Sequence, residues 1–256
     1  MPSHITIPEN HPRAESLRTR DLLISGFRRG LVAAEGLIAH GRGEAFDYLI
    51  GERTTDIARV AIRAAAALLL LSKRPVISVN GNMAALCPKE IVQLAESTGA
   101  GIEVNLFYRT NERERVIQKV LEAHGARNVL GVGPDASASI PELSSERRRV
   151  DPRGILVADT VFVPLEDGDR TEALVRMGKK VITVDLNPIS RTAKASNISI
   201  VDNVTRTMPA LIESAVRLKN NKDLHTIYNN FDNASNIDGS LEIIRKGNLI
   251  ADKKES

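Results

Sequence analysis

Six short runs of mostly β-branched residues recur along the middle of the chain, and they limit its possible folds more than any other feature. Gly, Pro, Asn or Asp bounds each run, as is typical of buried strands. The runs occupy residues 75–80, 101–107, 128–133, 159–164, 179–185 and 197–202. Helical patterns separate several of them, at 84–97, 111–124, 171–177 and 204–216. This alternation predicts an α/β fold with a doubly wound, mostly parallel sheet.

The residues before these runs have helical spacing instead. Between residues 11 and 41, apolar side chains recur every three or four positions, which predicts two helices with a break near Gly26 or Gly30. Thr54-Thr55-Asp56 is a helix-capping sequence and predicts a long helix that ends at about Leu71.

Changes in composition suggest three parts within one compact domain. An N-terminal helical segment, residues 1–72, packs on an α/β core of residues 73–218. Residues 219–256 are polar and rich in Asn, and we expect them to form a peripheral arm or a frayed tail with no chemical role.

The long helix predicted before residue 72 is apolar on almost every side, because it ends in the run "AAAALLLL" at 64–71. One face of a sheet can cover only one side of a helix, so another surface must cover the rest. We expect a homodimer built substantially on the N-terminal helices. The alternative is that residues 16–39 cover this helix within one chain.

Composition narrows the cellular setting and the partners. A single cysteine, Cys87, excludes an internal disulfide and favours a reducing, cytoplasmic compartment. The longest apolar run is shorter than the roughly 20 residues that span a bilayer. The net charge is only +3 and aromatic residues make up 3% of the chain. Basic residues are interspersed with acids except in the "RRR" run at 147–149. We therefore expect no membrane and no nucleic-acid partner, and we interpret the small excess of basic charge as a solvated mixed surface.

Polar clusters follow four of the predicted strands. In a doubly wound sheet, ligands bind beyond the carboxyl ends of the strands, where the strand order reverses. The clusters are "VNGNMAAL", "VNLFYRT", "VPLEDGDRTEAL" and "VDLNPISRTAK". The chain contains neither the GxxxxGK[ST] loop nor the complete GxGxxG pattern, so these generic nucleotide fingerprints are absent.

The cluster "VDLNPISRTAK" has the residues of a nucleotide site. Asp185 follows a strand, where a carboxylate can accept both ribose hydroxyls, and Ser190 and Arg191 can serve a phosphate. The alternative is an ordinary strand-to-helix turn capped by Ser190. After the next strand, Asp202 and Asn203 taken alone fit a helix cap better than a ligand site.

Acidic residues after another strand raise the question of a metal. Glu166, Asp167 and Asp169 could bind Mg²⁺, because hard cations prefer carboxylate oxygens. Asp169 followed by Glu172 also fits a capping box, which we favour. The sequence therefore predicts no metal site in the protein.

Three glycines surround two candidate catalytic residues in "GLIAHGRGE". Gly36, Gly41 and Gly43 predict a sharp turn near His40 and Arg42, just before a short helix. The alternative is a helix-packing corner with an exposed arginine. His40 could bind phosphate or accept a proton, but a lone histidine in a turn is more often structural, so the general base stays unassigned.

Several long motifs of this chain resemble the archaeal phosphopantothenate synthetase family, also called 4-phosphopantoate:β-alanine ligase. The similarity runs from about His11 to about Pro209. That resemblance implies a Rossmann-like dimer that joins 4-phosphopantoate to β-alanine in coenzyme A biosynthesis, while ATP becomes AMP and pyrophosphate. The motifs are "HGRGEAFDYLIGE", "VNGNMAALCPKEIVQLA", "EVNLFYRT", "DPRG", "VPLEDGDRTEALVRMGKKVI" and "DLNPISRTA".

The resemblance also implies a set of residues that contact ATP, which carries its own Mg²⁺. A second hypothesis from another class is a non-catalytic protein that senses adenine nucleotides. The implied ATP contacts are Arg20, Arg42, Asp185, Leu186, Asn187, Ser190, Arg191, Asp202 and Asn203.

Overall fold

A six-stranded parallel sheet forms the core of the computed structural model, which describes residues 8, 10–11, 13–165 and 168–247. The strand order is β3-β2-β1-β6-β7-β8, so it reverses between β1 and β6. Every predicted run contains one strand, and each strand is shorter than its run. The strands are β1 (Pro75–Val79), β2 (Gly101–Val104), β3 (Val129–Leu130), β6 (Thr160–Phe162), β7 (Lys180–Val184) and β8 (Ile198–Ile200).

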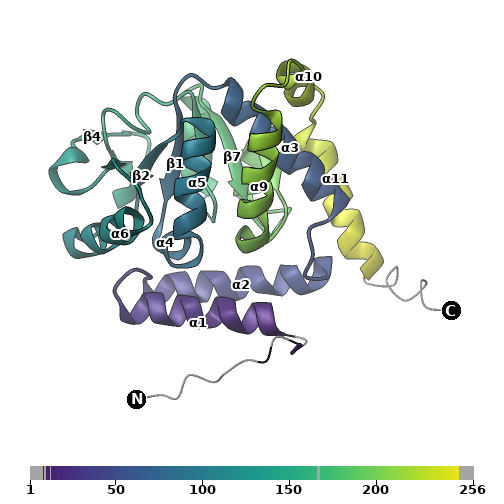
Figure 1. The fold of residues 1–256 in the computed structure, drawn as a ribbon, viewed down its shortest axis with the longest axis horizontal. Helices are drawn as coiled ribbons and strands as arrows, with labels where there is room; N and C mark the ends of the chain where they lie inside the picture. The colour runs from purple at the N-terminus through teal and green to yellow at the C-terminus, as the bar shows by residue number, and fades with distance from the viewer. Residues whose placement is uncertain (1–7, 9, 12, 166–167, 248–256) are drawn as a thin grey trace.

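Helices cover both faces of this sheet, which confirms the predicted doubly wound fold (Figure 1). Ile77 and Phe162 are paired across β1 and β6 and belong to the larger core, under α3, α5, α6 and α9. Val76 and Val161 point to the opposite face, where α7 and the segment 140–158 cover them. These helices are α3 (Asp56–Leu71), α5 (Pro88–Thr98), α6 (Asn111–Ala123), α7 (Gly168–Arg176) and α9 (Val204–Leu218).

Some short elements differ from the prediction. The helix expected at 84–97 is split into α4 (Gly81–Leu86) and α5, because Pro88 occupies the first position of α5 and has no backbone N–H. A small antiparallel pair, β4 (Ala138–Ser139) and β5 (Arg149–Val150), was not predicted. The remaining short elements are the 3₁₀ turns η1 (Gly133–Asp135) and η2 (Glu146–Arg148), and α8 (Arg191–Ala195).

The long helix α3 begins as predicted, because the Thr55 side chain accepts a hydrogen bond from the backbone N–H of Ala58. Its apolar surface is covered by α9 together with α10 (Leu224–Asn229) and α11 (Asn233–Lys246). Leu69 is fully buried within one chain. A second subunit is therefore not needed to cover most of α3, although Val60 is 60% exposed, and the homodimer stays a prediction. The expected cover by residues 16–39 is wrong, because α9, α10 and α11 provide it.

The C-terminal part of the chain is helical as far as it is described. α11 lies beside α3 and also contacts α8 and β8, at the edge of the sheet. Asp232 caps it by accepting a hydrogen bond from the backbone N–H of Ser235. A frayed tail is therefore wrong for α10 and α11, while the boundaries at 72 and 218 stay a prediction. Within the described part of the chain, no helix has the length and apolar character needed to span a membrane.

Two N-terminal helices form a separate layer that crosses one end of the sheet (Figure 1). They are α1 (Ala14–Arg28) and α2 (Ala34–Ile50). Gly30 lies in the connection with a φ of +76°, which confirms the predicted break. The predicted glycine turn is wrong, because Gly41 and Gly43 lie inside the continuous helix α2.

Glycine has a different role where this layer meets the core. A side chain at Gly36 would come within 2.5 Å of the Asn82 side chain, whose amide donates to the Gly36 carbonyl at 2.9 Å. A side chain at Gly81 would come within 2.2 Å of the Leu31 carbonyl. These two glycines let the N-terminal layer approach the start of α4 closely.

Candidate functional site

A cavity of about 610 Å³ lies between α2 and the carboxyl ends of the strands. Small-molecule sites span roughly 300–1,000 Å³, so this volume suits a ligand. Its position at the reversal of strand order is the one that the sheet topology predicts. One face of α2 forms a wall, with Glu35, Gly36, Ala39, His40, Arg42, Gly43 and Phe46.

The turn after β7 forms the facing part of this cavity. Asp185 is partly buried, and its carboxylate accepts from the Ser190 hydroxyl at 2.5 Å and from the Asn187 backbone N–H at 2.9 Å. Ser190 also caps α8 by accepting from the backbone N–H of Ala193. Leu186 and Asn187 line the cavity beside them, so this predicted cluster lies together at the site.

Arg42 and Asp185 influence each other electrostatically across the cavity. Burial raises the pKa of Asp185, while its two hydrogen bonds and the charge of Arg42 act in the opposite direction. Arg42 has an exposed side chain and makes no hydrogen bond or ion pair with another described residue. This guanidinium is therefore available to an anionic ligand.

Arg191 also lines the cavity, but its guanidinium has protein partners. It contacts Asp169 at 3.2 Å and Glu172 at 3.0 Å. Asp169 lies inside α7 and pairs with Arg191, so it does not act as the predicted cap. Glu166 and Asp167 lie outside the described residues. Among the residues that are described, no group of His, Cys, Asp or Glu side chains is placed to hold a metal ion.

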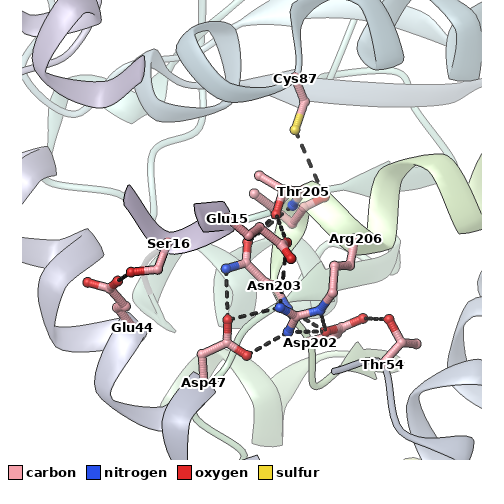
Figure 2. A network of polar contacts seen from close by, with 11 residues as sticks. Glu15, Ser16, Glu44, Asp47, Thr54, Cys87, Asp202, Asn203, Thr205 and Arg206 are labelled. Carbon is pink, nitrogen blue, oxygen red and sulfur yellow. Dashed lines mark hydrogen bonds and ion pairs between the residues drawn. The ribbon is translucent and has the colours of Figure 1, made fainter. Parts of the chain in front are cut away.

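The turn after β8 is organised differently (Figure 2). Asp202 is 1% exposed, and its carboxylate accepts from the Thr54 hydroxyl at 2.6 Å and from Arg206 at 2.7 Å. Asn203 caps α9 and donates its side-chain amide to Asp47 of α2 at 2.9 Å. The cap interpretation is confirmed for Asn203. Asn203 lines the cavity, whereas Asp202 does not.

Arg20 lies apart from these residues. Its guanidinium donates to both oxygens of Glu44 on α2, at 3.0 to 3.3 Å, and Ser16 donates to the same carboxylate at 2.8 Å. Arg20 does not line the cavity. Its contact with ATP therefore stays a prediction of the resemblance.

Comparison with known proteins decides the family. Residues 57–247 match the sequence model of phosphopantothenate/pantothenate synthetase. The chain belongs to this family. It is 52% identical over 244 residues to 4-phosphopantoate--beta-alanine ligase of Thermococcus kodakarensis, with 94% of this chain and 93% of that protein covered. A Methanosarcina mazei protein of the same name is 52% identical over 242 residues, with 94% of each chain covered.

A third family member, the 4-phosphopantoate--beta-alanine ligase of Methanospirillum hungatei, is 53% identical over 202 residues. That match covers 79% of this chain and 82% of the relative. The family predicted from the motifs is thereby confirmed. The match to the family model extends to residue 247 and so includes the C-terminal helices, where the motifs gave no resemblance.

Two arginines that line the large cavity were not predicted as site residues from the sequence. Arg113 lies on α6 and donates to the Leu31 carbonyl at 3.0 Å. Arg147 lies on η2, is 6% exposed and donates to the Asn105 carbonyl at 3.0 Å. Within the "RRR" run, Arg147 is therefore buried. The strand-end motifs did mark Asn80, Asn82, Phe107 and Tyr108, which line the same cavity.

Proposed function

We propose that the protein is an ATP-dependent ligase that condenses 4-phosphopantoate with β-alanine. The products are 4'-phosphopantothenate, AMP and pyrophosphate, and the reaction serves coenzyme A biosynthesis. The observation that carries the proposal is the cavity in which the Asp185 turn faces Arg42. Family relatives that bear the name of this ligase support the choice of substrates.

The positive charge of the cavity suits substrates that are all negatively charged and therefore repel one another. The reaction brings a triphosphate, a phosphate and a carboxylate into one cleft, which requires permanent positive charge. Arginine provides that charge together with bidentate geometry. Arg42, Arg113 and Arg147 all line the cavity, and they enter it from α2, α6 and η2. We therefore assign Arg42 to the phosphates of ATP and Asp185 to the ribose.

The reaction proceeds in two halves. A carboxylate oxygen of 4-phosphopantoate attacks the α-phosphorus of ATP, pyrophosphate leaves, and an acyl adenylate forms. The neutral amine of β-alanine then attacks the acyl carbon and AMP leaves. Positioning and electrostatic stabilisation supply most of the acceleration, because these steps need no covalent enzyme intermediate. Mg²⁺ enters with ATP, where it neutralises the departing pyrophosphate.

The proposal includes a homodimer in the cytoplasm, as the resemblance and the single cysteine suggest. The N-terminal layer supports pairing, because several apolar side chains of α1 and α2 are exposed. Light scattering at micromolar concentration tests this point, and a monomeric wild type at concentrations where it is fully active would contradict it. The exposed side chains are Leu22, Ile24, Phe27, Ile38, Tyr48 and Leu49.

One assay separates the ligase from a nucleotide sensor. The purified protein is incubated with ATP, Mg²⁺, 4-phosphopantoate and β-alanine, and AMP is measured with each acid omitted in turn. AMP formation that requires both acids supports the ligase. Binding of ATP in calorimetry without turnover would support the non-catalytic alternative.

A further inference from the structure

His40 borders two cavities at once. It lines the large cavity together with Arg42 and Asp185, and it also lines a second cavity of about 20 Å³ between the N-terminal layer and α9. The smaller space is sufficient for one water molecule. Its other charged lining residues are Glu15, Glu44, Asp47, Glu52 and Arg206.

Hydrogen bonds at the next turns of α2 fix the position of the helix segment that bears His40. Asp47, two turns after His40, accepts from Arg206 at 2.5 Å and from Asn203 at 2.9 Å (Figure 2). Glu44, one turn after His40, is held by Arg20 at 3.0 Å. The helix is therefore anchored to α9 on one side and to α1 on the other.

The charges around His40 suit a group that accepts a proton and passes it on. Burial lowers the pKa of His40, so the imidazole is neutral at neutral pH and can act as a base. Glu44 and Asp47 favour the imidazolium, while Arg20 opposes it. Glu15, Glu52 and Arg206 face it across the small cavity, and Glu35, Arg42 and Asp185 border the large one.

The amide-forming half of the proposed reaction needs such a base. An ammonium group has no electron pair with which to attack the acyl adenylate, so β-alanine must first lose a proton. Asp185 already accepts hydrogen bonds from Ser190 and Asn187. His40, in contrast, makes no hydrogen bond with another described residue, and it contributes the imidazole that borders the cavity.

We propose that His40 is the general base that deprotonates the ammonium group of β-alanine, an assignment that rests on the proposed ligase function. The ammonium proton moves to the imidazole, and the freed electron pair forms the C–N bond to the acyl carbon. The C–O bond to AMP breaks, and its electrons remain on the AMP phosphate. The second nitrogen proton leaves with that phosphate. The imidazolium returns its proton to water in the acid-lined small cavity.

Two half-reactions of one variant test this assignment. Pyrophosphate–ATP exchange, measured with 4-phosphopantoate and without β-alanine, reports adenylation alone. In His40→Gln, exchange should stay within about twofold of wild type, while amide formation should fall by about 100-fold, as expected for loss of a general base. His225→Gln, at an exposed position on α10, is the matched control and should change neither rate.

Hydroxylamine in place of β-alanine tests whether the defect lies in deprotonation of the amine. Hydroxylamine is mostly unprotonated at neutral pH, so hydroxamate formation should be nearly equal in His40→Gln and wild type. In the wild type, the rate of amide formation should fall as pH drops through a pKa below the usual histidine value of about 6.5, and exchange should not.

An equal loss of exchange and amide formation in His40→Gln, or no loss of either, would overturn the role of His40. If the wild type lacked exchange that depends on 4-phosphopantoate, the ligase function itself would fail. The wild-type exchange thus distinguishes failure of the proposed function from failure of the base.

Discussion

The two turns that follow β7 and β8 look alike in sequence and differ in the fold. Each places an aspartate after a β-branched strand, and the resemblance assigns both aspartates to the nucleotide. Asp185 lines the large cavity, and its carboxylate accepts hydrogen bonds from residues of its own turn, Asn187 and Ser190. Asp202 does not line this cavity, and its carboxylate oxygens accept hydrogen bonds from Thr54 and Arg206.

The difference lies in what covers each strand end. β8 is the last strand of the sheet. The end of α2 and the segment that follows it reach the turn after β8, where Asp47 contacts Asn203 and Arg206 and Thr54 contacts Asp202. Near β7, the corresponding space is the cavity itself. A strand-end carboxylate thus becomes available to a ligand only where no neighbouring element uses it.

The largest expected effect comes from Asp202→Ala. Removing this carboxylate leaves the Thr54 hydroxyl without its acceptor and Arg206 with Asp47 as its remaining close partner. We expect the free energy of unfolding to fall by about 3 kcal/mol, as when a buried ion pair loses one partner. Urea denaturation with an unchanged m-value measures this loss.

The corresponding control is Asp202→Asn, which preserves the shape of the side chain and removes its charge. Its loss of stability should be smaller than that of Asp202→Ala. If Asp202→Ala were as stable as wild type but bound ATP more weakly, Asp202 would be an ATP-binding residue and not a structural one.

Arg42→Ala should weaken the reaction without unfolding the protein. Loss of a charge-assisted phosphate contact should lower turnover or raise the KM for ATP at least about tenfold, on the order of 1.4 kcal/mol. Arg53→Ala, at an exposed position just after α2, is the matched control and should leave the kinetics unchanged. Unchanged kinetics in a folded Arg42→Ala protein would contradict this role.

Asp185→Ala should have a smaller effect that is specific to the nucleoside. We expect about fivefold weaker binding of both ATP and AMP, because both contain the ribose and one hydrogen-bonding group is lost. Isothermal titration calorimetry measures the two affinities. An intact affinity for AMP would move the nucleoside to another strand end.

Sequence patterns predicted the elements whose local signals agree with their surroundings. The six strands of the parallel sheet and the Thr55 cap of α3 follow from residue types that favour one conformation. The Asp185 turn was predicted for the same reason, because it forms its own hydrogen bonds within "DLNPIS".

Other features depend on partners that are distant in sequence. Gly41 and Gly43 favour a turn locally, yet α2 stays helical through them, because its neighbouring turns are anchored by Arg20, Asn203 and Arg206. Arg147 belongs to a charged run but is buried, since it reaches a backbone carbonyl 42 residues away in sequence. No local pattern carries that information.

The smallest expected effect concerns the acidic residues that follow β6 in the sequence, and it tests whether the protein provides a metal site there. Asp169 pairs with Arg191, so its carboxylate has a partner without a metal. We expect Mg²⁺ to be obligatory for turnover, because it accompanies ATP. In Asp167→Asn and Asp169→Asn, the Mg²⁺ concentration that gives half-maximal rate should therefore stay within about twofold of wild type at fixed ATP. A divalent ion that binds tightly to the nucleotide-free protein and is lost in these variants would establish a protein-held metal. The segment after β6 would then bind a cation, while the strand end at β7 binds the ribose, and the contrast with the closed strand end at β8 would be greater still.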